Sequence, residues 1–142
     1  MASHRRALVL DANILIRAVL GSRVRNLILD NLDRSGFFTP GSCIADARHY
    51  LPDILAKRGI DPAPALEVLD MLLRHIQCIE DEWLDGHASL AQTRMGRRDP
   101  DDWPVLAAAL SLACPIWTQD TDFFGTGVAT WSTEHIEDFF AH

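Results

Sequence analysis

The segment Ala7-Leu8-Val9-Leu10-Asp11-Ala12-Asn13 is a short apolar run that stops at an acidic residue. A continuous apolar run without alternation is typical of a strand that is buried on both faces, as in a parallel sheet. Residues 14–19 then carry apolar side chains at helical spacing, and Gly21 is placed to end that helix. The segment therefore predicts a buried strand followed by a helix, with Asp11 between them.

The same alternation of strands and helices continues along the chain. Apolar periodicity predicts further helices over 23–32, 64–73, 82–91 and from Asp102 onwards, and a terminal helix over 134–140 that covers a sheet edge or serves in a dimer. Short apolar runs predict strands over 36–40, 76–79, 115–118 and 127–130. Ser42 is expected to cap the helix that carries Asp46, and Pro52 to kink or divide it. This order indicates an α/β protein, a three-layer α/β/α fold around a mostly parallel sheet of about four or five strands.

The composition is that of an ordinary globular protein. The 142 residues are 48% hydrophobic and 23% charged, which allows a core to form without disulfide bonds and argues against disorder. We expect one domain over residues 1–142. The apolar run behind the basic start ends at Asp11, too early for a signal peptide or a membrane span, so we expect a cytoplasmic protein without membrane attachment. The three cysteines are widely spaced and suggest neither a zinc site nor a disulfide framework.

Four aspartates occupy positions that a parallel sheet would bring to one edge: Asp11, Asp46, Asp102 and Asp120. The carboxyl ends of parallel strands form the crevice where ligands bind, so residues distant in sequence can share one pocket. Each acid alone is more simply explained as a helix cap or a turn residue. Together they would repel one another unless a cation, a shared proton or solvent relieved the repulsion. Hard, oxygen-seeking ions such as Mg²⁺ or Mn²⁺ fit this arrangement best.

The formal net charge of −7 does not favour nucleic acid, because affinity for phosphates comes largely from Lys and Arg. Four of the acids belong to the candidate site, however, and a bound divalent ion would offset part of their charge. Arg94, Arg97 and Arg98 cluster directly ahead of Asp99. Since arginine suits bidentate phosphate contacts, these three are candidates for holding an RNA backbone, and a solvated charged loop is the alternative.

The residues around the four acids resemble the PIN-domain ribonucleases, which include the VapC-type toxins of bacterial toxin–antitoxin pairs. The resemblance spans nearly the whole chain. Val9 to Leu15 is similar to that family's first strand, with its leading acid and following Asn. Further similarity lies in Thr39 to Asp46, in Arg98 to Ala109, which is the most specific match, and in Pro115 to Phe124.

Carried over by position, the resemblance implies a metal-dependent endoribonuclease that hydrolyses RNA with a water activated by Mg²⁺ or Mn²⁺. It implies that all four aspartates are catalytic and that Asp11, Asp102 and Asp120 bind the metal. The implied supporting residues are Asn13, Thr118, Asp101 and Asp122, and the last two could exchange roles with their acidic neighbours Asp102 and Asp120. The implied partners are an RNA substrate, a small antitoxin protein and a second copy of the chain in a homodimer.

Other functions stay open at this point. The family often has Glu at the position of Asp46 and a hydroxyl residue at that of Ala12, so the main alternative is a catalytically silent PIN-like module that binds RNA or protein. A receiver-type Mg²⁺-binding signalling domain would need a lysine late in the chain, and Lys57 is too early. A haloacid-dehalogenase-type phosphatase would need an aspartate where Asn13 stands.

Overall fold

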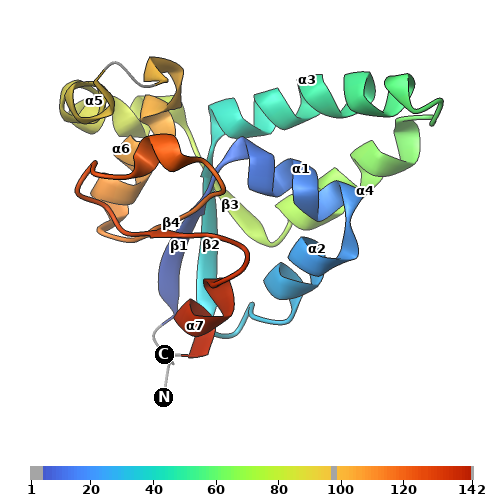
Figure 1. Cartoon of the computed structure of the whole chain (residues 1–142), viewed down its shortest axis with the longest axis horizontal. Helices are drawn as coiled ribbons and strands as arrows, with labels where there is room; N and C mark the ends of the chain where they lie inside the picture. Colours follow the sequence, from blue (N-terminus) through green and yellow to red (C-terminus); the bar gives the residue numbers. More distant parts are fainter. Residues whose placement is uncertain (1–4, 97–98, 142) are drawn as a thin grey trace.

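The computed structural model describes residues 5–96 and 99–141, and its centre is a parallel sheet (Figure 1). The strand order is β3-β2-β1-β4-β5, and each pairing is parallel. The strands are β1 (Arg6–Leu10), β2 (Ser35–Pro40), β3 (Ile76–Ile79), β4 (Ile116–Trp117) and β5 (Thr130–Trp131). The predicted parallel sheet is confirmed.

Helices cover the sheet on both sides. They are α1 (Ala12–Leu20), α2 (Ser22–Leu29), α3 (Gly41–Lys57), α4 (Ala63–Leu73), α5 (Asp81–Met95), α6 (Trp103–Leu112) and α7 (Ile136–Ala141), with short 3-10 helices η1 (Pro100–Asp102) and η2 (Thr121–Phe123). Figure 1 shows α1 to α4 on one side of the sheet and α5 and α6 on the other, which confirms the three-layer fold. Within the described ranges, no helix is long and apolar enough to cross a membrane.

Strand β1 lies at the centre of the molecule. It pairs with β2 on one side and with β4 on the other, and Leu8, Val9 and Leu10 have no exposed surface. Because helices cover both faces of this strand, its three buried positions need apolar side chains, which explains the continuous run seen in the sequence. Thr39 of β2 donates a hydrogen bond from Oγ1 to the Leu10 carbonyl oxygen at 2.9 Å, and this bond fixes the end of β1 just before Asp11.

Helix α3 differs from the prediction at its start, and it is not divided at Pro52. It begins at Gly41, with Pro40 in the capping position and no side-chain capping bond, so the predicted role of Ser42 as the cap is wrong. The reason is that Pro40 is already extended (φ −65°, ψ 151°) at the end of β2, and the chain turns directly into the helix. The helix also continues through Pro52 without dividing, because Leu51 and Leu55 on either side are buried in the core.

The last part of the chain also departs from the predicted bounds. The final strand is Thr130–Trp131, later than the predicted 127–130, because Gly127 adopts a left-handed conformation (φ +89°) in the preceding turn. Helix α7 packs on the sheet within the chain: the ring of Phe140 lies 6.0 Å from Phe37 of β2 and 6.1 Å from Trp117 of β4. Figure 1 shows α7 near the starts of β1 and β2, at the end of the sheet opposite their carboxyl ends.

Candidate functional site

The four predicted aspartates come from four elements and line one cavity of about 210 Å³. Asp11 follows β1 and caps α1, and Asp120 follows β4 and caps η2. Asp102 ends η1 immediately before α6, and Asp46 lies in the second turn of α3. Asn13, predicted as a polar support, lines the same cavity. The structure therefore brings the four acids together at the carboxyl edge of the sheet.

Asp11 is the most deeply buried of these acids, with 6% of its surface exposed. Its Oδ1 accepts the backbone N–H of Ile14 at 3.0 Å, and its Oδ2 accepts the hydroxyl of Thr118. Burial raises the pKa of Asp11 from 3.8 to about 6; the hydrogen bonds from Thr118 and Ile14 oppose this increase, and the charge of Asp120 adds to it. The protein thus holds a carboxyl group that is costly to ionise without a cation.

Thr118, predicted as a support, connects two of the acids. It is 3% exposed, and its Oγ1 donates to Asp11 while accepting the backbone N–H of Asp120 at 2.9 Å. A hydroxyl is suited to this position because it can donate and accept at once. Thr118 therefore sets the orientation of the Asp11 carboxylate and the start of the turn that carries Asp120.

Asp102 is half-buried and also has a raised pKa, about 7. Burial is the largest cause, followed by the charge of Asp99 and then by the charge of Asp120, while Asp11 contributes less. Several carboxylates in one hollow therefore suppress one another's ionisation. A divalent cation in the hollow would reverse that effect, since it favours the charged form of every acid around it.

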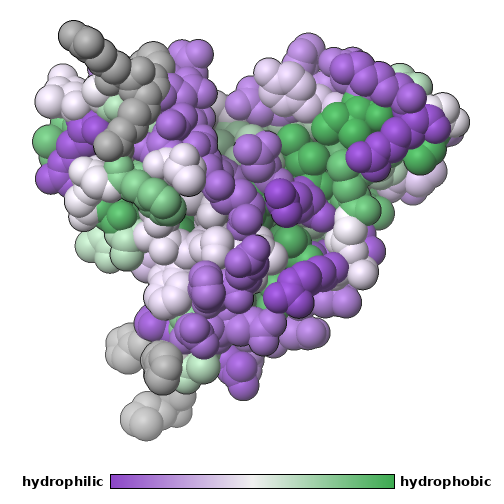
Figure 2. Space-filling view, viewed as in Figure 1, coloured by the Kyte–Doolittle hydropathy of each residue, from purple (hydrophilic) through white to green (hydrophobic). Residues whose placement is uncertain are grey.

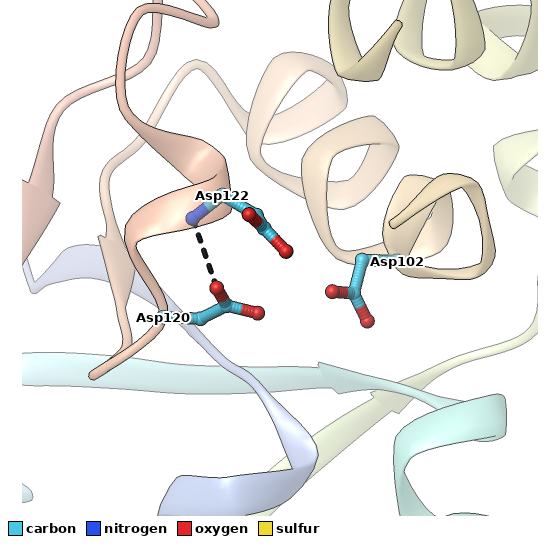
Figure 3. A group of neighbouring side chains, drawn as sticks. All are labelled: Asp102, Asp120 and Asp122. Atoms are coloured by element: carbon cyan, nitrogen blue, oxygen red, sulfur yellow. Dashed lines mark hydrogen bonds between the residues drawn. The ribbon is translucent and has the colours of Figure 1, made fainter. Parts of the chain in front are cut away.

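Three carboxylates form the tightest group at the site: Asp102, Asp120 and Asp122 each offer an oxygen, and these oxygens lie within 4.8 Å of one another. Figure 3 shows the three side chains converging on one space, Asp102 from the start of α6 and the other two from the η2 turn. The backbone N–H of Asp122 donates to Asp120 Oδ1 at 2.9 Å, which holds the turn closed. A set made only of carboxylate oxygens fits Mg²⁺ or Mn²⁺.

This group differs in one member from the metal ligands that the sequence predicted. Asp122, predicted as a support, lies in the tight group, whereas Asp11, predicted as a ligand, lies outside that group but lines the same cavity. Asp46 and Asp101 are exposed and line the cavity as well.

Among the residues that line the cavity but were not assigned to the site from the sequence are Asp99 and Tyr50. Asp99 precedes the predicted pair Asp101 and Asp102; its Oδ1 accepts the backbone N–H of Asp101 at 3.1 Å, and its charge raises the pKa of Asp102. Tyr50 lies one helical turn after Asp46, is 50% exposed and brings a phenol to the rim. Both had a signal in the sequence: Asp99 belongs to the same acidic run, and Tyr50 follows Asp46 by four residues on a helix.

Of the three predicted RNA-binding arginines, the structure describes Arg94. Arg94 is in the last turn of α5, and its Nη1 donates to the Thr126 carbonyl oxygen at 3.2 Å. It does not line the acidic cavity. Arg97 and Arg98 fall outside the described residues.

The fold and the site define an α/β protein with an acidic cavity at the carboxyl edge of a parallel sheet. Residues 9–140 match the family model of the PIN domain. The chain belongs to the PIN-domain family, whose members are generally nucleases, and the resemblance seen in the sequence is confirmed.

Solved structures with this fold are distant in sequence. PAE2754 from Pyrobaculum aerophilum is 20% identical with a TM-score of 0.72, covering 99% of this chain and 93% of that chain. VapBC2 from Rickettsia felis, bound to a DNA fragment from its promoter, is 12% identical with a TM-score of 0.67, covering 89% and 98%. FitAcB from Neisseria gonorrhoeae is 22% identical with a TM-score of 0.55, covering 90% and 99%. No curated protein matches the sequence significantly.

Proposed function

We propose that this chain is a divalent-metal-dependent endoribonuclease that hydrolyses RNA phosphodiester bonds. The observation that carries the proposal is the convergence of Asp102, Asp120 and Asp122, with ligand oxygens within 4.8 Å of one another, in a chain of the PIN-domain family. These residues, with Asp11 beside them, are suited to hold Mg²⁺ or Mn²⁺. When bound, such an ion supplies a water of lowered pKa and polarises the scissile phosphate.

The protein's own residues have distinct tasks in this proposal. Asp102, Asp120 and Asp122 would hold the cation at the end of the sheet, and Thr118 orients the Asp11 carboxylate at the same cavity through its hydroxyl. Asp46 lies on the exposed rim of the cavity, where it can orient the attacking water and accept its proton. Asn13 and Asp101 line the same cavity as polar supports. No side-chain nucleophile is required.

The RNA backbone is proposed to contact the arginines near the end of α5. Arg94 is held against the carbonyl oxygen of Thr126 through Nη1, and a guanidinium group has five N–H donors, a number that allows it to bind phosphate oxygens as well. Arg97 and Arg98 follow it in sequence and share this proposed role.

The wider biological role is proposed from the family resemblance. The chain would be a cytoplasmic toxin of a toxin–antitoxin pair, acting as a homodimer of one PIN domain over 1–142 and inhibited by a small antitoxin protein. The sequence resemblance to VapC-type toxins supports this role, as does the fold shared with the Rickettsia felis VapBC2 and Neisseria gonorrhoeae FitAcB proteins. Co-purification of the chain with the product of a neighbouring small gene would test it.

The nuclease proposal is tested by incubating purified protein with total RNA in Mn²⁺ or Mg²⁺, with a chelator control. Asp102→Asn keeps the side-chain size but removes a metal-binding charge, so cleavage should fall at least ~100-fold, the cost typical of losing one electrostatic stabiliser of a transition state. Asp53→Asn, an exposed aspartate of α3 outside the cavity, is the matched control and should cleave normally. Chelator-resistant cleavage, or full activity of Asp102→Asn, would refute the proposal. Binding of RNA without cleavage would indicate the silent module instead.

A further inference from the structure

A second hollow opens next to the acidic cavity, and Asp120 lines both of them. Its volume is about 320 Å³, near the lower end of the range for small-ligand sites, roughly 300–1,000 Å³. Its lining residues come from the turn that follows β4, from the edge strand β5 and from the segment after β5. Because one carboxylate borders both hollows, a molecule whose phosphate reached the acidic cavity could place an adjoining group in the second.

The walls of this second hollow combine flat rings with polar groups. Phe124 is 57% exposed, and the half-buried ring of Trp131 packs on Phe139 at a centroid distance of 6.0 Å. His135 and Ser132 supply hydrogen-bonding groups at the same hollow. Aromatic faces beside hydrogen-bonding side chains are what proteins use to bind unpaired bases of single-stranded nucleic acid.

Hydrogen bonds fix this hollow in place relative to the carboxylates. The backbone N–H of Thr118 donates to the Trp131 carbonyl oxygen at 3.0 Å, while its hydroxyl contacts Asp11. The Thr133 N–H donates to Gln119 Oε1 at 2.6 Å, and the Trp117 indole N–H donates to the Thr133 hydroxyl at 3.1 Å. The strand end that positions Asp11 and Asp120 therefore also positions the aromatic wall.

We propose that the hollow formed by Phe124, Trp131 and His135 binds one unpaired nucleobase adjoining the scissile phosphate. This inference rests on the proposed nuclease function. A base inside a duplex is stacked on both faces and paired along its edge, so it cannot enter such a hollow without leaving the helix. An unpaired base can stack on Phe124 or Trp131 while His135 and Ser132 bind its edge. Its covalently attached phosphate then reaches the acidic cavity beside Asp120, where the proposed divalent cation would offset the repulsion between phosphate and carboxylates.

The test pairs substitutions in the protein with abasic sites in the RNA. Single-stranded oligonucleotides that the wild type cleaves at one position are made with an abasic site at each nucleotide flanking that position. One abasic position should lower the cleavage rate by about 5- to 150-fold, the effect of losing one stacked base. Phe124→Ala should lower cleavage of the intact oligonucleotide by a similar factor. When Phe124→Ala is assayed on the oligonucleotide whose abasic site lowers cleavage, the substitution should lower the cleavage rate little further, because both changes remove the same contact.

Two further variants separate stacking from a general loss of structure. Phe124→Tyr keeps an aromatic ring at this position, so its cleavage rate should be close to that of the wild type. Trp83→Ala is the control: it removes a side chain that is 79% exposed on α5 and lines neither hollow, so it should also cleave like the wild type. Equal cleavage of single-stranded and fully paired RNA, or fully additive losses for Phe124→Ala and every abasic site, would overturn the inference.

A binding measurement distinguishes failure of this inference from failure of the proposed function. In the Asp102→Asn background, a fluorescent single-stranded RNA should bind more tightly than a duplex of the same sequence, and adding Phe124→Ala should remove that preference. If the wild type cleaves no RNA but this preference is present, the nuclease proposal fails and the base site stands. If the wild type cleaves RNA and the preference is absent, the base site fails alone.

Discussion

Replacing Asp11 with Asn should stabilise the metal-free protein at neutral pH while removing a carboxylate from the candidate site. Asp11 is 6% exposed, and burial is the main reason that its pKa rises from 3.8 to about 6. Above the raised pKa the folded protein must hold a desolvated charge, whereas in the unfolded chain the same group is ionised in water. Asn has the same shape, can still accept the N–H of Ile14 at the start of α1, and carries no charge.

The magnitude follows from the two pKa values. At ~1.36 kcal/mol per pKa unit, the difference between 3.8 and about 6 corresponds to a contribution of ~3 kcal/mol to the free energy of unfolding when Asp11 is protonated in the folded protein. Because the folded-state pKa is raised, this stability is fully present below 3.8 and is lost as the pH rises through about 6. Roughly 2 kcal/mol of it is lost between about pH 4.5 and pH 8. Asp11→Asn abolishes that loss but weakens the contact with Thr118 by ~1 kcal/mol, so its net gain at pH 8 is about 1–2 kcal/mol.

The assay is urea unfolding of both proteins in excess chelator at about pH 4.5 and pH 8. For each protein, the change in unfolding free energy between the two pH values is determined, and the change in the variant is subtracted from that in the wild type. The contributions of the other titrating groups largely cancel in this difference. Asp11→Ala serves as the control: it removes the same charge but also the N-cap, so it should be less stable than Asp11→Asn at both pH values by ~1 kcal/mol. Equal pH dependence in wild type and Asp11→Asn would refute the reasoning.

Three further outcomes are expected. Mn²⁺ at about one hundred times its dissociation constant should raise the unfolding free energy of the wild type by ~2.7 kcal/mol, and that of Asp120→Asn by much less, because the variant lacks one of the carboxylates proposed to bind the ion. Thermal unfolding of both proteins with and without Mn²⁺ measures this difference. Thr118→Val removes a hydrogen bond that lowers the pKa of Asp11, so an NMR titration of the carboxyl carbon should find that pKa above about 6. Ala113→Gly should stabilise the protein by ~0.5–1 kcal/mol in urea unfolding, since Ala113 caps α6 in a left-handed conformation (φ 51°).

The sequence predicted best those elements whose burial leaves a local signature. Strand β1 is covered on both faces, so its apolar run is uninterrupted, and the predicted strand over 76–79 has the same bounds as β3. The start of α3 was less predictable because it depends on where β2 ends, and that end is fixed by the bond from Thr39 to the Leu10 carbonyl oxygen, 29 residues apart. Propensities are local and carry no such information.

The location of the candidate site was predictable from the sequence, but its exact set of converging carboxylates was not. That Asp11 and Asp120 meet at one edge follows from parallel strands, whose carboxyl ends coincide. That Asp122 rather than Asp11 completes the tightest carboxylate group depends on the Asp122 N–H bond to Asp120 Oδ1, which folds the η2 turn back on itself. A turn of this kind is set by hydrogen bonds over two residues, and the spacing of acids alone does not determine which of them converge.

The aromatic hollow lay beyond sequence reasoning because it depends on the register of β5. The predicted strand over 127–130 would have ended before Trp131, whereas the observed register pairs Ile116 with Thr130 and Trp117 with Trp131. This shift of the strand along the sheet brings Trp131 level with the end of β4, beside the turn that carries Asp120. Since register is a tertiary property, only the fold reveals that a ring and a carboxylate from distant segments are neighbours.

Thr118 couples the two hollows, and this coupling determines which substitutions can separate them. Its hydroxyl contacts Asp11, and its backbone N–H donates to the Trp131 carbonyl oxygen at 3.0 Å. A change at Trp131 that moves β5 would therefore also move the Thr118 hydroxyl and alter the pKa of Asp11, so lost cleavage would report on both sites at once. Phe124 follows η2, and its backbone N–H donates to the Thr121 carbonyl oxygen at 3.0 Å. Its substitution should leave the pKa of Asp11 unchanged, which makes Phe124 the residue on which base binding can be tested independently of metal binding.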